Sequence, residues 1–218
     1  MKLSDLLRCG IGATVCSAAL AQAPGHPNLN AQLLVAARQG ELAQVERVLA
    51  QGAAPDSRNR LGKTALLIAA ERGQLPLAER LIAAGANVDL ASLEGVTPLM
   101  AASYGGHLAL VQRLLERGAR TDPLDRMHKP AIVYAAGQGH AEVLAALLDA
   151  GIPIDTAYEH GLTALMWAAG QGQAAAVRLL LERGARTDLR DDRGLTAAEI
   201  ARQADHAELG ALIDARRS

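Results

Sequence analysis

A period of 33 residues runs through most of the chain and limits what it can fold into. One glycine series comprises Gly62, Gly95, Gly161 and Gly194, with His128 at the remaining position of the register. A second series at the same step comprises Gly52, Gly85, Gly118, Gly151 and Gly184. Two glycine series at one spacing do not arise from composition. The chain is therefore predicted to be an array of similar structural units.

Each unit shows the same local signals. A turn ends in Gly-x-Thr and leads into an apolar stretch, as in GKTALLIAAERG from Gly62. Another glycine ends that stretch, and the next stretch has apolar residues at helical spacing, as in Val111, Leu114 and Leu115. A glycine suited to a left-handed helix terminus then closes the second helix. The sequence thus predicts one turn and two helices in every unit.

These signals resemble the ankyrin repeat, whose signature is a β-turn, two antiparallel helices and a Thr-Pro-Leu-His helix start. One unit here begins Thr97-Pro98-Leu99, although Met100 replaces the family's His. The resemblance covers residues 29–218 and implies an all-α solenoid of about six repeats. The expected units are 29–61, 62–94, 95–127, 128–160, 161–193 and 194–218.

The N-terminal segment, residues 1–21, has the features of a secretory signal peptide. Lys2 and Arg8 give a basic start, a short apolar stretch follows, and Ala19-Leu20-Ala21 is a small-x-small cleavage site. The alternative is a buried first helix of the solenoid. Residues 22–28 are interpreted as a linker. Both cysteines lie in the segment 1–21, and a cysteine-free mature chain tolerates an oxidising compartment. We expect export to a bacterial periplasm.

Composition narrows the function classes. Half of the residues are hydrophobic, yet the only aromatic residues are three Tyr and one Trp. Small side chains let helices approach closely, as a stacked solenoid requires. The formal net charge of −1 does not favour nucleic-acid binding. No apolar run after the N-terminal segment is long enough to span a membrane.

No catalytic motif is present. The sequence has no Gly-x-Ser-x-Gly, His-Glu-x-x-His or phosphate-binding loop. His107 and His140 occupy equivalent positions and would supply two metal ligands, but in the family this His satisfies loop carbonyls. The pair Asp122 and Asp125 is interpreted as a turn cap in the same way. We therefore expect no enzymatic activity, no cofactor and no metal.

The fourth unit departs from the pattern at its start. His128 stands where the other units have Gly, and Pro130 stands where they have Thr. A positive φ at His128 would cost about 1 kcal/mol. Two interpretations stay open: drift in a tolerant array, or a soft point or specialised contact.

The remaining function is binding of a protein partner. The resemblance implies contacts at the turn tips and at the ends of the first helices. The residues expected there are Arg60, Glu71, Arg72, Leu93, Glu94, Tyr104, Arg126, Met127, Gln138, Tyr158, Glu159, His160, Gln171 and Arg190.

Tyr104 and Tyr158 are the favoured anchors, because Tyr is over-represented among residues that dominate interface energetics. Both would otherwise be exposed loop residues with no partner. Tyr134 and Trp167 fall in the column of Ile68 and Ala101, which we expect to face the core.

The sequence therefore predicts a non-enzymatic protein-interaction scaffold. An inhibitor or immunity-type protein that blocks an enzyme is the alternative. Resemblance to small exported bacterial ankyrin proteins also implies an accessory role in peroxide defence.

Overall fold

The computed structural model describes residues 27–216, so the expected signal peptide and most of the expected linker lie outside it. The described residues form twelve α-helices, one 3₁₀ turn and no β-strand. The helices are α1 (Pro27–Gln39), α2 (Leu42–Ala50), α3 (Ala65–Glu71), α4 (Leu75–Ala83), α5 (Pro98–Tyr104), α6 (Leu108–Glu116), α7 (Ala131–Gln138), α8 (Ala141–Asp149), α9 (Ala164–Gly170), α10 (Ala174–Glu182), α11 (Ala197–Gln203) and α12 (Ala207–Asp214), and the 3₁₀ turn is η1 (Glu159–Gly161).

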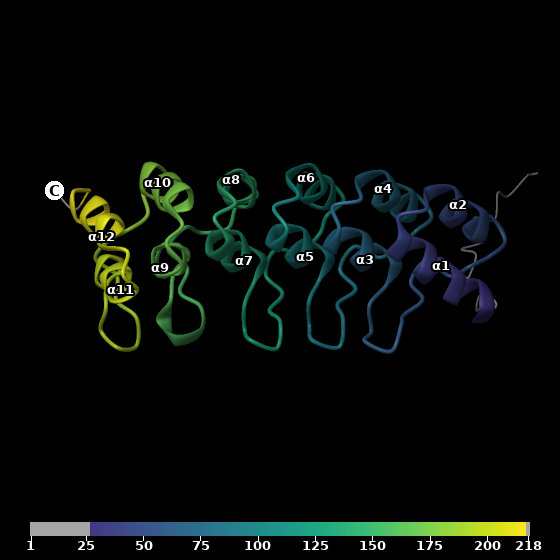
Figure 1. Cartoon of the computed structure of the whole chain (residues 1–218), viewed down its shortest axis with the longest axis horizontal. Helices are drawn as coiled ribbons and strands as arrows, with labels where there is room; N and C mark the ends of the chain where they lie inside the picture. Colours follow the sequence, from purple (N-terminus) through teal and green to yellow (C-terminus); the bar gives the residue numbers. More distant parts are fainter. Residues whose placement is uncertain (1–26, 217–218) are drawn as a thin grey trace, which may run out of the picture.

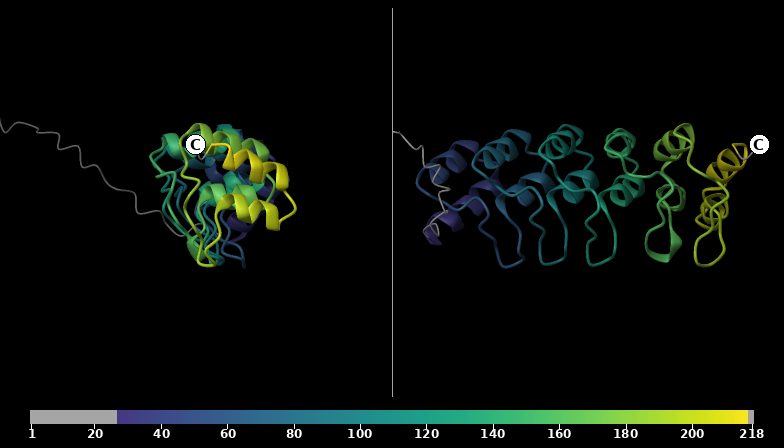
Figure 2. Two further views of the ribbon diagram at one scale, coloured as in Figure 1. Left: turned by 90° about the vertical axis from the view of Figure 1, so that its left-hand side faces the viewer. Right: turned by 180° about the vertical axis from the view of Figure 1, so that it is seen from behind.

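The helices form two layers in an elongated stack. Odd-numbered helices make one layer, even-numbered helices make the other, and hairpin loops project beyond the odd-numbered layer (Figure 1). The view along the stack shows these loops on one side of the molecule (Figure 2). The prediction of an all-α solenoid is confirmed, although α1 already begins at Pro27 rather than at Leu29. Across residues 27–216, no helix has the length and apolarity needed to cross a lipid bilayer.

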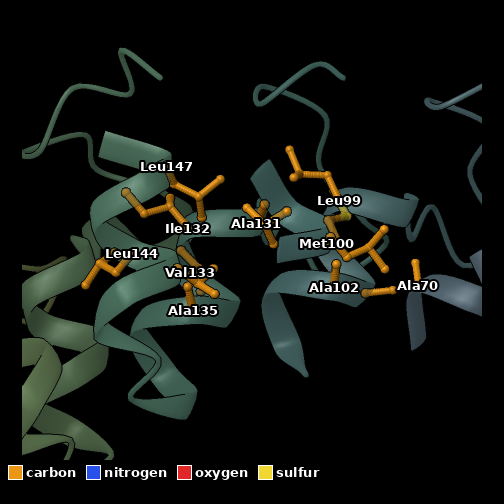
Figure 3. Packing of buried hydrophobic residues seen from close by; sticks show 14 of the residues in the cluster. Ala70, Leu99, Met100, Ala102, Ala131, Ile132, Val133, Ala135, Leu144 and Leu147 are labelled. Atoms are coloured by element: carbon orange, nitrogen blue, oxygen red, sulfur yellow. The ribbon is translucent and has the colours of Figure 1, made fainter. Parts of the chain in front are cut away.

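Alternating Leu and Ala side chains hold neighbouring repeats together. Leu66 of α3, Leu99 of α5 and Leu144 of α8 are essentially inaccessible to solvent. Each such side chain contributes about 1.5–3 kcal/mol through its burial. Ala131 of α7 lies in the cluster that also contains Leu99 (Figure 3). Alanine at such positions allows the first helices of adjacent repeats to pack closely.

Threonine begins most first helices. Thr64, Thr97, Thr163 and Thr196 each accept a hydrogen bond from the backbone N–H three residues later. Repeat 4 lacks this cap because Pro130 has no side-chain acceptor. His128 has a φ of 53°, in the region that favours glycine. The structure therefore confirms that the start of repeat 4 combines backbone strain with a missing cap.

The hairpin loops are closed by short polar side chains. Asp125 Oδ1 accepts the N–H groups of Met127 at 2.9 Å and Lys129 at 2.8 Å. Asp191 accepts the equivalent bonds from Arg193 and Leu195, both at 2.9 Å. We number each hairpin by the repeat whose first helix follows it, so the loop between α2 and α3 is the second hairpin. Asn59 and Ser92 accept the equivalent bonds in the second and third hairpins. Asp125 and Asp191 are turn caps, as the sequence predicts. Asp122, which was predicted to cap the turn with Asp125, accepts hydrogen bonds from the Arg120 side chain.

Repairing the start of repeat 4 should stabilise the protein. The double substitution His128→Gly and Pro130→Thr removes the positive-φ strain and restores the cap, each worth about 1 kcal/mol. We expect the free energy of unfolding in urea to rise by about 2 kcal/mol. The reciprocal control, Gly161→His with Thr163→Pro in repeat 5, should lower it. An unchanged midpoint for the repaired protein would show that the stack absorbs the irregularity.

Asp191 should make stability depend on acidic pH. Burial alone would raise its pKa, but the bonds from Leu195 and Arg193 prevail and lower it. Its contribution is therefore complete above the unfolded carboxyl pKa of about 3.9 and is lost as pH falls through the lower folded value.

Asp191→Asn keeps an amide acceptor like that of Asn59 but loses the charge. We expect a loss of about 1 kcal/mol at neutral pH, measured by chemical denaturation, and a difference from the wild type that begins to shrink below about pH 3.9 and is lost below the folded pKa of Asp191. A difference that persists in acid would contradict this role, and exposed Asp192→Asn is the control.

Candidate functional site

The hairpin tips are linked into a row by backbone hydrogen bonds. Leu93 N–H donates to the carbonyl of Leu61 at 3.0 Å, which joins the third hairpin to the second. Arg126 donates to Glu94 at 2.9 Å, which joins the fourth hairpin to the third. The second, third and fourth tips are thus each held by a turn cap and by a neighbouring tip. These three tips form an edge that presents side chains at regular intervals.

The row is interrupted between the fourth and fifth hairpins. Asp192 donates to His160 at 3.0 Å, but in the described residues the corresponding bond from Glu159 to Met127 is absent. The fifth hairpin also differs locally, because Tyr158 stands where the others have a short polar cap. Its loop contains the turn η1, and His160 there adopts a φ of 61°. The fifth tip therefore has its own backbone conformation.

Of the two favoured anchors, Tyr158 is less exposed than Tyr104. Its ring is only partly exposed and packs against the hydrophobic core. Burial raises the pKa of its hydroxyl above the ordinary value. A large ring at a turn-cap position folds inward because it has no short acceptor to offer the backbone. The Tyr158 ring therefore connects the fifth hairpin to the hydrophobic core.

The other predicted contact residues lie on the surface. Leu93, Tyr104 and Met127 are more than half exposed, at 63%, 54% and 58%. Such exposure is notable for large apolar side chains that lie along one edge. The remaining predicted residues that are exposed are Arg60, Glu71, Arg72, Glu94, Arg126, Gln138, Glu159, His160, Gln171 and Arg190.

Ion pairs order some of these side chains. Lys63 Nζ lies 2.6 Å from Glu71 Oε1, which joins the second hairpin to the end of α3. Arg126 Nη1 lies 3.0 Å from Glu94 Oε1 on the neighbouring tip. Exposed pairs of this kind are worth less than about 1 kcal/mol in stability. Their effect here is to hold the side chains in place.

Beneath the tips, three adjoining hollows form a groove along the first helices. The first, of about 380 Å³, is lined by Glu71, Met100, Tyr104 and Tyr134 among others. The second, of about 170 Å³, shares Tyr104 and Tyr134 with the first and adds Trp167. The third, of about 300 Å³, shares Trp167 with the second and continues to α11. We call this continuous depression the aromatic groove.

The aromatic side chains in the groove contact one another or a neighbouring cation. The rings of Tyr104 and Tyr134 meet edge to face, with centroids 5.7 Å apart and planes at 83°. Lys129 Nζ lies 4.5 Å from the centre of the Trp167 ring, a cation–π contact. These contacts connect repeats 3, 4 and 5. The groove therefore offers rigid aromatic surfaces with a cation beside them.

Asp125 connects the groove to the hairpin row. The same carboxylate that closes the fourth hairpin also accepts a hydrogen bond from the Tyr134 hydroxyl. Burial, followed by this bond to Asp125, raises the pKa of Tyr134 well above its usual value. Tyr134 is therefore a neutral donor across the physiological range. Asp125 therefore holds both the backbone of the fourth hairpin and the Tyr134 ring that lines the groove.

The interpretation of Tyr134 and Trp167 as core residues is wrong in part. Ile68 and Ala101 in the same column are buried, each 7% exposed. Tyr134 and Trp167 are only partly buried and line the groove. Their size is the signal that could have identified them, because the side chains buried in this column are the smaller Ile and Ala. The contact of Lys129 with Trp167 was not predicted, since only the three-dimensional position of Lys129 reveals it.

The recurring histidines have structural roles. His140 Nε2 lies 3.0 Å from the carbonyl oxygen of Tyr104 in the preceding repeat. A Cβ added to Gly106 would lie 2.6 Å from the His140 ring, so glycine is required for this packing. His107 lies against Gly73 in the same manner. Among residues 27–216, no group of three or more His, Cys, Asp or Glu side chains is arranged to hold a metal.

Comparison with known proteins agrees with this geometry. The family model described as ankyrin repeats in three copies matches residues 33–125 and again residues 120–191. A comparison with curated proteins gave no match. The matched residues include most of the described solenoid, with its paired helices and projecting hairpins. This chain therefore belongs to the ankyrin repeat family.

Proposed function

We propose that this protein is a non-enzymatic binding protein that captures a partner protein along its hairpin tips and aromatic groove. Ankyrin repeats are generally protein–protein interaction modules. The observation that carries the proposal is the gathering of three of the chain's four aromatic residues, Tyr104, Tyr134 and Trp167, in one open groove. Aromatic side chains bring large contact area with few rotatable bonds, so they dominate many interfaces.

The polar groups of the surface support binding rather than chemistry. Asp125 and Asp191 are occupied by the backbone of their own hairpins. Glu71 and Glu94 are engaged by Lys63 and Arg126. A general acid or base needs a group free to exchange a proton with a substrate. These carboxylates instead make the surface rigid, which lowers the entropic cost of binding.

We also propose that the protein acts after export, in a bacterial periplasm. The support lies in the sequence of residues 1–21, with its basic start, short apolar stretch and Ala19-Leu20-Ala21 site.

The export proposal predicts a defined mature N-terminus. Intact-mass measurement of the protein recovered from the cell envelope should show a chain that begins at Gln22. Ala21→Leu should block processing and leave the longer chain, because the cleavage site requires a small residue. A mature protein that still begins at Met1 would overturn the proposal.

The binding proposal predicts that the groove aromatics control partner capture. The double substitution Tyr104→Ala and Trp167→Ala should weaken capture at least about tenfold, because truncation of each anchor removes buried aromatic area. Tyr134 is left unchanged because its bond to Asp125 maintains the hairpin. Capture is measured by crosslinking in the native cell envelope, followed by quantitative mass spectrometry of the proteins attached to the chain.

The matched control lies on the opposite layer of the same repeats. Gln112→Ala with Arg178→Ala alters exposed residues of α6 and α10, and capture should stay at the wild-type level. Circular dichroism checks that both variants keep their helices. Equal capture by the groove variant and the wild type would show that the partner binds elsewhere. The identity of the captured protein then distinguishes a scaffold from an inhibitor of an enzyme.

A further inference from the structure

Three arginines lie around the loop between α2 and α3 and the end of α3. Arg58 and Arg60 lie on the tip of the second hairpin, and Arg72 follows directly after α3. All three are exposed, and within residues 27–216 none of them makes an ion pair. We call these three residues the arginine patch.

Arg72 ties the arginine patch to one end of the aromatic groove, because it directly follows Glu71, which lines the first hollow. The ion pair of Lys63 with Glu71 holds the second hairpin against the end of α3, where Arg72 lies. Glu71 itself lines the first hollow together with Tyr104 and Tyr134. Because Lys63 neutralises Glu71, the charge at this end of the groove is that of the arginines.

A second cation lies further along the groove. Lys129 Nζ rests over the ring of Trp167, and among the described residues it has no carboxylate partner. The hollow between Tyr104 and Tyr134 is therefore flanked by positive charge on both sides. A segment that runs along the groove would meet cation, apolar hollow and cation in that order.

In the opposite layer, Arg80, Arg113 and Arg183 each pair with a carboxylate of the preceding repeat, whereas Arg47, Arg117 and Arg178 make no ion pair within residues 27–216. The arginine patch differs from these residues in its position, because it lies on the side of the hairpins and the first helices. The whole chain carries a formal net charge of −1, so the protein as a whole does not supply positive charge to the groove. Complementary charge of this kind steers the approach of a partner and fixes its register.

We propose that the groove takes an extended acidic segment of the partner protein. Its carboxylates meet the arginine patch and Lys129, and a large apolar side chain between them enters the hollow formed by Tyr104 and Tyr134. This inference rests on the proposed function and specifies the chemistry of the partner. A nucleic acid fits less well, because Glu94 and Glu159 interrupt the basic residues along the tips, whereas a phosphate backbone requires a continuous basic stripe.

Selection from a random peptide library displayed on phage tests the proposal directly, because it requires no particular partner protein. The purified protein should enrich peptides in which Asp or Glu flanks a large apolar residue. The strongest enriched peptide is then synthesised with a fluorophore, and its dissociation constant is measured by fluorescence anisotropy. Raising the salt concentration should weaken binding, because charge pairs contribute to it.

Two variants with the same change in net charge separate the patch from the overall charge. Arg58→Glu, Arg60→Glu and Arg72→Glu should weaken the selected peptide at least about tenfold. Arg47→Glu, Arg117→Glu and Arg178→Glu, on exposed positions of the opposite layer, should change it less than about twofold. If the patch variant loses its helical circular dichroism, the corresponding Gln variants replace it.

Each outcome bears on a different claim. Enriched peptides that are neutral or basic, or that bind both variants equally, would overturn the acidic-segment inference. If these peptides still lost affinity with Tyr104→Ala and Trp167→Ala, the proposed protein-binding groove would stand. Peptides indifferent to the groove substitutions, or no enrichment at all, would count against both.

Discussion

Close approach between the first helices of neighbouring repeats is the interaction on which the rest of this structure depends. Ala69, Ala102, Ala135 and Ala168 occupy one column of the first-helix layer and are completely inaccessible to solvent. Their small side chains bring adjacent backbones together, and the larger Leu residues fill the space toward the second layer. The hairpins then stand near enough to exchange backbone hydrogen bonds. Register along the tip row follows from packing in the alanine column.

The same stacking sets the surroundings of the aromatic residues. Tyr134 and Trp167 belong to the neighbouring column, in which the smaller Ile68 and Ala101 are buried. The two larger rings are only partly buried there and line the groove. Asp125, which closes the fourth hairpin, also accepts a hydrogen bond from the Tyr134 hydroxyl. The proposed binding groove is thus built on the same packing that holds the stack together.

Periodicity in the sequence was sufficient to predict the architecture, because each repeat contains nearly all the information for its own fold. The turn, the Thr cap and the two helices depend on residues close together in the sequence. Residues such as Gly62 and Thr64 therefore predict them without information about distant residues. The groove depends on contacts between repeats. Lys129 reaches Trp167 across a repeat boundary, and the direction of the Tyr158 ring depends on the core beneath it. No local pattern encodes either contact, so the sequence predicted which residues lie at the tips but not the contacts between repeats that shape the groove.

The missing bond between Met127 and Glu159 has a mechanical consequence. Among the described residues, the fourth and fifth hairpins lack this backbone bond and contact one another through side chains instead, with His128 Nδ1 3.6 Å from Glu159 Oε1. The tips therefore divide into a group of three hairpins and a group of two, each joined internally by backbone hydrogen bonds. A bend of the solenoid between these two groups would break no backbone bond between tips, whereas a bend elsewhere along the row would.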